Sequence, residues 1–235
     1  MEADFVIIGS GSAGSAMAAR LSEDGQYSVI VLEYGGSDAG PFIQMPGALS
    51  YPMNMPLYDW GYRSEPEPHL GGRQLACPRG KVIGGSSSTN AMAYVRGNRG
   101  DYDRWASLGL ADWSYERVLP YFRKAERDLD EATPGHGTSG PIPVRRVPEA
   151  EWSGFTRAVG DAFVALGHAR RADQNGPWED GVMPTSVNLD EEWRRVSTAV
   201  GYLDATVRAR PNLVLLPRHV ARRLMVEGTR VAGAE

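Results

Sequence analysis

The hydrophobic pattern of the first 33 residues predicts a strand, a helix and a second strand. Apolar residues run without interruption from Phe5 to Ile8 and from Val29 to Leu32. Such runs are typical of strands that are buried on both faces of a parallel sheet. Between them, residues 14–22 repeat small and apolar side chains at helical spacing, and Gly25 provides a stop signal. The segment is therefore expected to form a right-handed β-α-β unit.

The remaining chain alternates between irregular and patterned stretches. Residues 34–81 are rich in glycine, proline and aromatic residues and have no sustained periodicity, which predicts irregular but ordered structure. Helical spacing recurs later, and short apolar runs predict strands. The expected helices are 114–128, 152–166 and 197–209; the expected strands are an edge strand at 141–144, a strand at 212–216 and a hairpin with arms 223–226 and 231–234.

Composition narrows the functional classes. The 235 residues are 42% hydrophobic and 23% charged, with a formal net charge of −4, so no basic surface for nucleic acid or an anionic membrane is expected. Cys77 is the single cysteine, which excludes an internal disulfide and a thiolate metal cage and favours a reducing compartment. The amino terminus does not resemble a secretory signal and the apolar runs are short, so a cytoplasmic location is expected.

A glycine motif lies between the first predicted strand and helix. Gly9, Gly11 and Gly14 form a GxGxxG pattern, which allows a tight turn, close approach to a pyrophosphate, and close helix packing. Glu33 follows about 20 residues later at the end of the second strand, where an acid accepts hydrogen bonds from a ribose. The pattern predicts a dinucleotide site and disfavours a 2′-phosphate, but it does not separate NAD from FAD.

A second cluster of small residues spans Arg79 to Asn90. Its consecutive glycine and serine residues could lie against a flat ring system, although a flexible serine loop has the same composition. Together with other segments, this cluster resembles the glucose-methanol-choline (GMC) oxidoreductases over essentially the whole chain. The further segments that carry the resemblance are Tyr58–Tyr62, Ser64–Pro66, Tyr94–Gly97, Asp101–Trp105, Trp113–Tyr115, Leu119–Phe122, Arg195–Ala199 and Tyr202–Leu203.

The resemblance implies an α/β fold, with a Rossmann-type FAD-binding domain and an inserted, incomplete segment of a substrate domain. The implied boundaries are 1–140 and 196–235 for the FAD-binding domain and 141–195 for the inserted segment. It also implies a set of cofactor-binding positions. These are Gly9, Gly11, Ser12, Gly14, Glu33, Tyr34, Trp60, Arg79, Val82, Gly84, Gly85, Ser87, Asn90, Ala91 and Val220.

Three positions depart from the family pattern. Thr89 stands where an aliphatic residue is usual, and some members bind flavin covalently through a histidine there, so the resemblance implies non-covalent FAD in this chain. Ala91 stands where glycine is usual, and Tyr34 where alanine is usual. Thr89 and Ala91 lie where the flavin is expected to pack, so a changed affinity or redox potential is expected.

The implied activity is oxidation of a small primary alcohol to an aldehyde, by hydride transfer to flavin N5. Family members are more than twice as long, and their catalytic histidine is expected beyond Glu235, so no catalytic residue is assigned. The alternative is a catalytically silent FAD-binding fragment. The choice between choline-like and aryl or furfuryl alcohols, the oxidant and the oligomeric state stay open.

Other polar residues are not assigned to chemistry. His69, His136, His168 and His219 are expected to be surface or loop histidines. Asp128, Asp130 and Glu131 are expected to form a solvated face, and no metal site is expected.

Overall fold

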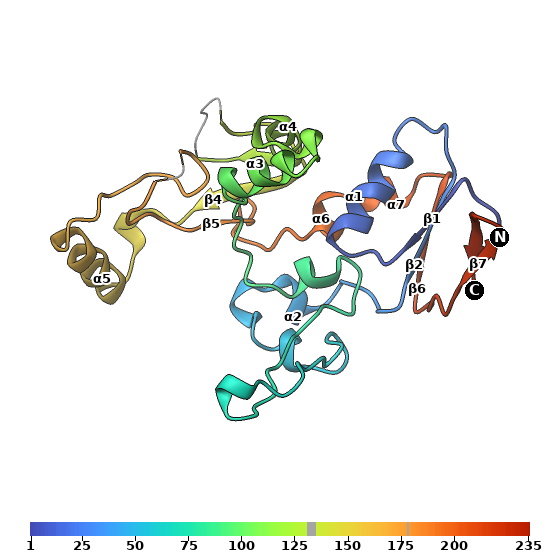
Figure 1. Ribbon diagram of the computed structural model, residues 1–235, viewed down its shortest axis with the longest axis horizontal. Helices are drawn as coiled ribbons and strands as arrows, with labels where there is room; N and C mark the ends of the chain where they lie inside the picture. The colour runs from blue at the N-terminus through green and yellow to red at the C-terminus, as the bar shows by residue number, and fades with distance from the viewer. Residues whose placement is uncertain (131–134, 178) are drawn as a thin grey trace. The chain divides into compact units, whose positions relative to one another are not determined.

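The computed structural model describes residues 1–130, 135–177 and 179–235, and Glu131 of the expected acidic face lies outside them (Figure 1). The chain divides into two compact units. The first unit comprises Met1–Ala91 and Trp193–Glu235, and the second unit comprises Met92–Glu192. The boundaries of these compact units differ from those of the expected functional domains, because residues 92–140 belong to the second unit rather than the first. The assignment of cofactor-binding and substrate domains therefore stays a prediction.

The first unit contains the expected β-α-β arrangement. Strands β1 (Phe5–Ile8), β2 (Val29–Glu33) and β6 (Leu213–Pro217) form a parallel sheet in the order β1-β2-β6, and α1 (Ser12–Leu21) connects β1 with β2 (Figure 1). Val31 lies opposite Ile7 on one side and Leu215 on the other. The prediction of these three strands and the first helix is confirmed.

The core of the first unit forms where α1 and the later helices meet this sheet. Ala18 of α1 and Val31 of β2 are fully buried, and they share a cluster with Ala199 and Leu203. Burial of such apolar side chains contributes roughly 1.5–3 kcal/mol for each larger one, which holds the sheet and helices together. The loops that follow β1 and β2 are therefore attached to a well-packed hydrophobic core.

The remaining elements of the first unit are short. The expected helix over 197–209 is instead two helices, since Ser197 caps α6 (Thr198–Gly201) and Asp204 caps α7 (Ala205–Arg208). The expected irregular region contains brief helical turns and isolated β-bridges, and the expected hairpin is present, with Gly228 in its turn. These elements are α2 (Pro41–Gln44), η1 (Pro46–Ala48), η2 (Pro52–Asn54), η3 (Pro68–Leu70), η4 (Gly85–Ser88), β7 (Leu224–Glu227) and β8 (Arg230–Ala234).

The second unit is built around a small mixed sheet. Strand β4 (Ile142–Arg146) lies between β3 (Glu126–Asp128), which is parallel to it, and β5 (Ser186–Val187), which is antiparallel. The remaining elements are α3 (Arg99–Ser107), η5 (Ala111–Trp113), α4 (Tyr115–Ala125), η6 (Glu149–Glu151) and α5 (Gly154–Ala165).

Two sequence expectations for this sheet are wrong. The helix expected over 114–128 ends at Ala125, because the last three residues pair with β4 as a strand. The 141–144 segment is not an edge strand, because β4 has a neighbour on each side. Pro143 is compatible with this position since the ladder with β5 involves only Arg145 and Arg146, so no β5 residue needs its missing N–H.

Helix α5 has the expected amphipathic spacing, but its apolar side remains open. Phe163 is 48% exposed, and Phe155 and Leu166 are more exposed still. Part of this side lines a cavity of about 790 Å³ together with Trp152 and Val182. Among the described residues, no helix combines the length and apolarity needed to cross a bilayer.

Candidate cofactor site

The first glycine motif joins β1 to α1 in a tight turn, in which the backbones of Gly9 and Gly14 are in close contact. Gly9 has a φ of +91°, a left-handed conformation that glycine adopts without strain. A Cβ atom at Gly14 would lie 1.9 Å from the carbonyl oxygen of Gly9, so no other residue fits there. This contact lets the amino-terminal turn of α1 approach the end of β1, and its free backbone N–H groups form an anion-binding position.

The two glycine clusters lie against each other in the first unit. The N–H of Gly84 donates to the carbonyl oxygen of Ser10, at 2.9 Å. A Cβ atom at Gly85 would lie 2.7 Å from the Cα atom of Gly11, which is too close for an ordinary contact. Two segments more than 70 residues apart thus build one surface whose backbone is open to a ligand.

Glu33 is buried at the carboxyl end of β2, with 5% of its surface exposed. Its Oε2 atom accepts hydrogen bonds from the N–H and the hydroxyl of Ser10, both at 2.8 Å, and its Oε1 atom accepts one from the N–H of Gly35, at 2.7 Å. These bonds fix the carboxylate at the glycine turn. An ionised carboxylate has about four lone-pair positions, so one remains for a further donor such as a sugar hydroxyl.

Eight of the fifteen predicted residues line one cavity of about 400 Å³, a size within the usual range for small-molecule sites. They are Gly9, Gly11, Ser12, Glu33, Tyr34, Trp60, Gly85 and Val220. The other seven predicted residues are not among its lining: Gly14, Arg79, Val82, Gly84, Ser87, Asn90 and Ala91. The lining residues that the sequence did not single out are Ile8, Leu32, Gly80, Ser86, His219 and Ala221.

The missed residues had signals of two kinds. Ile8 ends β1, Leu32 is the last residue but one of β2, and His219 and Ala221 flank the predicted Val220. Their position follows from backbone pairing, because the N–H of His219 donates to the carbonyl oxygen of Glu33. Each of the six missed residues is next in sequence to a predicted residue, so adding the immediate neighbours would have found them all.

An aromatic pair forms one wall of the cavity. The rings of Tyr34 and Trp60 lie with their centroids 4.6 Å apart, and the ammonium of Lys81 lies 6.0 Å from the Trp60 ring centroid. The Trp60 segment is held by Asp59, whose carboxylate accepts from the N–H groups of Arg79 and Gly61. Tyr34, one of the departures from the family pattern, thus contributes a flat surface on which a ring can stack.

The serine-rich loop is hydrogen-bonded to residues of the segment 195–199. The Ser87 hydroxyl donates to the carbonyl oxygen of Gly84 at 2.6 Å and lies 2.9 Å from the Thr198 hydroxyl. The Arg195 guanidinium donates to the carbonyl oxygen of Ser87 and to Oδ1 of Asn90. Ser87 therefore serves the loop's own structure, and Asn90 is oriented by an arginine.

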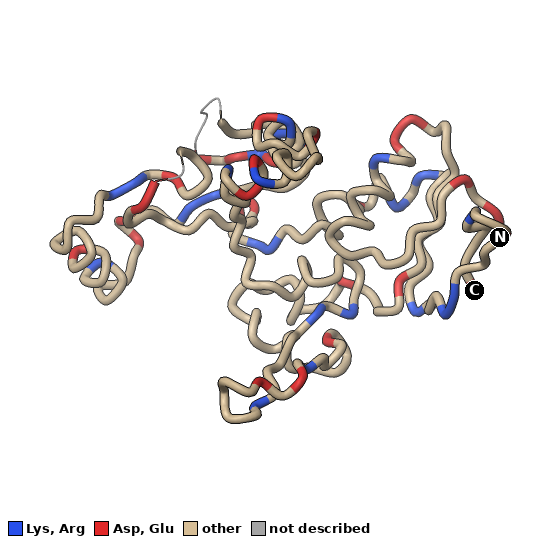
Figure 2. The backbone as a smooth tube through the Cα atoms, viewed as in Figure 1, with Lys and Arg blue, Asp and Glu red and all other residues tan. Residues whose placement is uncertain are grey.

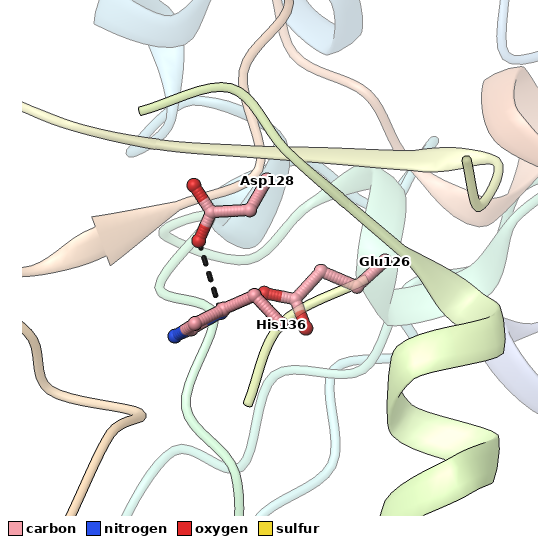
Figure 3. A group of neighbouring side chains, drawn as sticks. All are labelled: Glu126, Asp128 and His136. Carbon is pink, nitrogen blue, oxygen red and sulfur yellow. Dashed lines mark hydrogen bonds and ion pairs between the residues drawn. The ribbon is translucent and has the colours of Figure 1, made fainter. Parts of the chain in front are cut away.

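A second group of polar residues lies in the second unit, and it corrects two expectations. His136 is buried rather than a surface histidine, with 2% of its surface exposed. The Asp128 side chain is fully buried rather than solvated. Figure 3 shows the His136 ring beside the carboxylates of Glu126 and Asp128. His69, His168 and His219 are exposed, as expected.

The charges of this group are balanced by basic residues. His136 also lies 2.8 Å from Asp173, Arg146 pairs with Asp128 and Asp173, and Arg96 pairs with Glu126. Figure 2 shows acidic and basic residues close together along this unit. Three largely buried carboxylates thus face two guanidinium groups and one imidazole, and a fourth, Asp130, whose side chain is 31% exposed, lies 4.0 Å from Arg146.

The pairing keeps the histidine protonated. Hydrogen bonds to Asp128, then Asp173 and Glu126, raise the pKa of His136 to about 11 despite its burial. Burial favours neutral Asp173, but hydrogen bonds from His136 and Arg146 outweigh it and lower the pKa of Asp173 to about 2.

Ligand atoms of Glu126, Asp128 and His136 lie within 4.8 Å of one another, which is compatible with a metal ion in distance alone. The carboxylates of Glu126 and Asp128 already pair with Arg96 and Arg146, whose positive charges would repel a metal cation. The group is therefore an ion-pair network that links β3 to β4.

Comparison with known proteins assigns the family. The family model described as GMC oxidoreductase matches residues 3–235. The chain belongs to the GMC oxidoreductase family. It is 50% identical to an oxygen-dependent choline dehydrogenase of Brucella anthropi, and the match covers 100% of this chain and 42% of that protein. The chain thus spans less than half the length of this relative.

Solved structures agree with the fold. Pyridoxine 4-oxidase from Mesorbium loti is 37% identical, with a TM-score of 0.93, over 100% of this chain and 47% of that one. An FAD-dependent oxidoreductase from Chaetomium thermophilum is 30% identical, with a TM-score of 0.89, over 99% of this chain and 41% of that one. Family membership and these neighbours support a flavin cofactor.

The site itself fits a dinucleotide cofactor. Its floor is backbone at Gly11 and Gly85, where a side chain would fill the space, and its polar groups are the helix amino terminus and Glu33. A pyrophosphate suits the first group and a ribose suits the second.

Proposed function

We propose that this chain forms the cofactor-binding part of an FAD-dependent oxidoreductase that oxidises the CH–OH group of a small primary alcohol. The observation that supports it most is the single cavity in which Gly11, Gly85 and Glu33 meet. The names of the relatives also support it, since choline and pyridoxine both carry a primary alcohol.

The residues of the chain have separate roles in this proposal. The turn at Gly9–Gly11 and the start of α1 bind the pyrophosphate, while Glu33 accepts from a ribose hydroxyl. Tyr34 and Trp60 cover the adenine side of the cavity, and the loop at Gly84–Asn90 positions the flavin ring. When bound, the flavin supplies the acceptor for the hydride that leaves the alcohol carbon. Thr89 at the position of the covalent histidine leaves the cofactor dissociable.

A second candidate function is cofactor binding without turnover. It is favoured by the state of the acid–base groups at the cavity. Nδ1 of His219 lies 2.9 Å from the carbonyl oxygen of Pro217, and Glu33 already accepts three hydrogen bonds. Glu33 is therefore committed to the glycine turn, and His219, beside the predicted cofactor contact Val220, keeps only its Nε2 atom as a proton acceptor.

Anaerobic reduction separates the two functions. The chain is reconstituted with FAD and mixed with choline, pyridoxine and an aryl alcohol, while the flavin absorbance is followed. Oxidation predicts bleaching with at least one primary alcohol and formation of the aldehyde. A flavin that stays oxidised with every alcohol, yet is reduced by dithionite, contradicts turnover by this chain and leaves cofactor binding as its function.

A further inference from the structure

Arg195 is a buried cation without an acidic partner. Only 2% of its surface is exposed, yet no carboxylate pairs with it among the residues that the structure describes. Its Nη1 atom donates to the carbonyl oxygen of Ser87, at 3.2 Å, and to Oδ1 of Asn90, at 3.1 Å. Its Nε and Nη2 atoms are buried and have no hydrogen-bond partner within the described part of the chain.

Such an arrangement costs stability. A buried charge without a counter-charge loses its hydration and gains little in return, a penalty of several kcal/mol. The same burial lowers the pKa of Arg195 to about 10, so the group is still protonated at neutral pH. A methionine of similar volume would remove this penalty, which indicates that the positive charge serves something other than the stability of the fold.

The position of Arg195 indicates what it serves. Both of its acceptors belong to the loop that continues from Gly84 and Gly85, next to Gly11. Its donation to Oδ1 of Asn90 fixes which end of that amide is the acceptor and which is the donor. The Nε and Nη2 atoms of Arg195 are buried and cannot contact a ligand directly. Arg195 therefore acts on a ligand in two indirect ways, by orienting the loop and by the electrostatic potential of its charge.

This inference rests on the proposed function. We propose that Arg195 is a positioning residue for the flavin: it orients the Asn90 amide and supplies an unneutralised positive charge that raises the reduction potential of the bound cofactor. A cation near the flavin favours the reduced form, which carries more negative charge than the oxidised form. Oriented Asn90 contributes to cofactor affinity.

The test measures the chain with FAD in four forms: wild type, R195M, R195Q and R195K. The readouts are the FAD dissociation constant, the midpoint potential against a reference dye, and the urea midpoint of the apo chain. R195M is expected to weaken FAD binding about tenfold, the loss of one hydrogen bond to a charged group. It lowers the potential and leaves apo stability unchanged or higher. R195Q also lowers the potential, whereas R195K stays near wild type.

Several outcomes overturn the inference. Equal potentials in wild type, R195M and R195Q would show that the charge does not act on the flavin. A loss of apo stability in R195M together with an unchanged potential in R195Q would assign Arg195 a purely structural role. If wild type itself binds no FAD, the proposed function fails. If wild type binds FAD and the variants have the same affinity and potential, only the inference about Arg195 fails.

Discussion

The two units contain buried arginines in opposite electrostatic settings. Arg96 of the second unit pairs with Glu126 and donates to the carbonyl oxygens of Gly135 and Asn175. Arg195 of the first unit has a carbonyl and an amide oxygen as acceptors and no counter-charge within the described residues. Both side chains are equally buried, at 2% exposure.

The difference distinguishes buried charges that stabilise the fold from a buried charge that is available to act on a ligand. In the second unit, three carboxylates, two arginines and His136 cancel one another, which is how a buried ionic network contributes to a fold. In the first unit, Arg195 has no counter-charge within the described residues, and the first turn of α1 has backbone N–H groups without an intrahelical acceptor. Positive charge and helix N–H groups of this kind favour the binding of an anionic ligand.

The largest expected effect comes from removing Arg96. R96M leaves Glu126 buried with one partner fewer and is expected to cost about 3–5 kcal/mol of unfolding free energy. Urea unfolding followed by circular dichroism measures this. R127M, in the strand that contains Glu126, is the control, because the Arg127–Glu191 pair is exposed and contributes about 1 kcal/mol or less. Equal stabilities of R96M and R195M would remove the contrast between the two arginines.

The histidine in the network gives a smaller and pH-dependent effect. The pKa of His136 is raised above its unfolded value of 6.5 to about 11, so its contribution is complete below pH 6.5 and is lost as pH rises towards 11. At pH 6, H136Q is expected to be about 3 kcal/mol less stable than wild type. Urea midpoints measured from pH 6 to 10 should converge for the two proteins.

A constant difference between wild type and H136Q across that range would contradict the protonated state of the histidine. On the acid side the pKa of Asp173 is lowered to about 2 from 3.8, so its contribution is complete above pH 3.8 and disappears as pH falls through 2. A stability loss that already begins near pH 6 on acidification would not come from this aspartate.

The first unit could be predicted well from the sequence because its signals are local. Phe5–Ile8, the glycines that follow and Val29–Glu33 are contiguous patterns, and each specifies a backbone conformation that the structure shows. The same holds for Gly14, where the lack of a side chain is required by one contact with Gly9. Local patterns of this kind are sufficient for a strand-turn-helix site.

The second unit was harder to predict because its interactions join distant residues. In the sequence, Asp128 looks like the end of a helix and His136 like a loop residue, and it is the pairing of β3 with β4 that brings Asp128 next to Arg146. No periodicity marks such a network. In the sequence Arg195 is notable only as part of a family motif, because its lack of a counter-charge depends on what surrounds it after folding.

The measurement that tests the cofactor site most directly is titration of FAD into the chain and two glycine variants. In G85A a Cβ atom would lie 2.7 Å from the Cα atom of Gly11, so the two glycine segments must separate. G71A is the control, because Gly71 also has a positive φ but its Cβ atom would meet no neighbour within 4 Å. Wild type and G71A should bind FAD with similar dissociation constants, and G85A at least about tenfold more weakly, a change of about 1.4 kcal/mol. Absence of saturable binding to wild type, or equal affinity of G85A, would contradict the assignment of this cavity to the flavin cofactor.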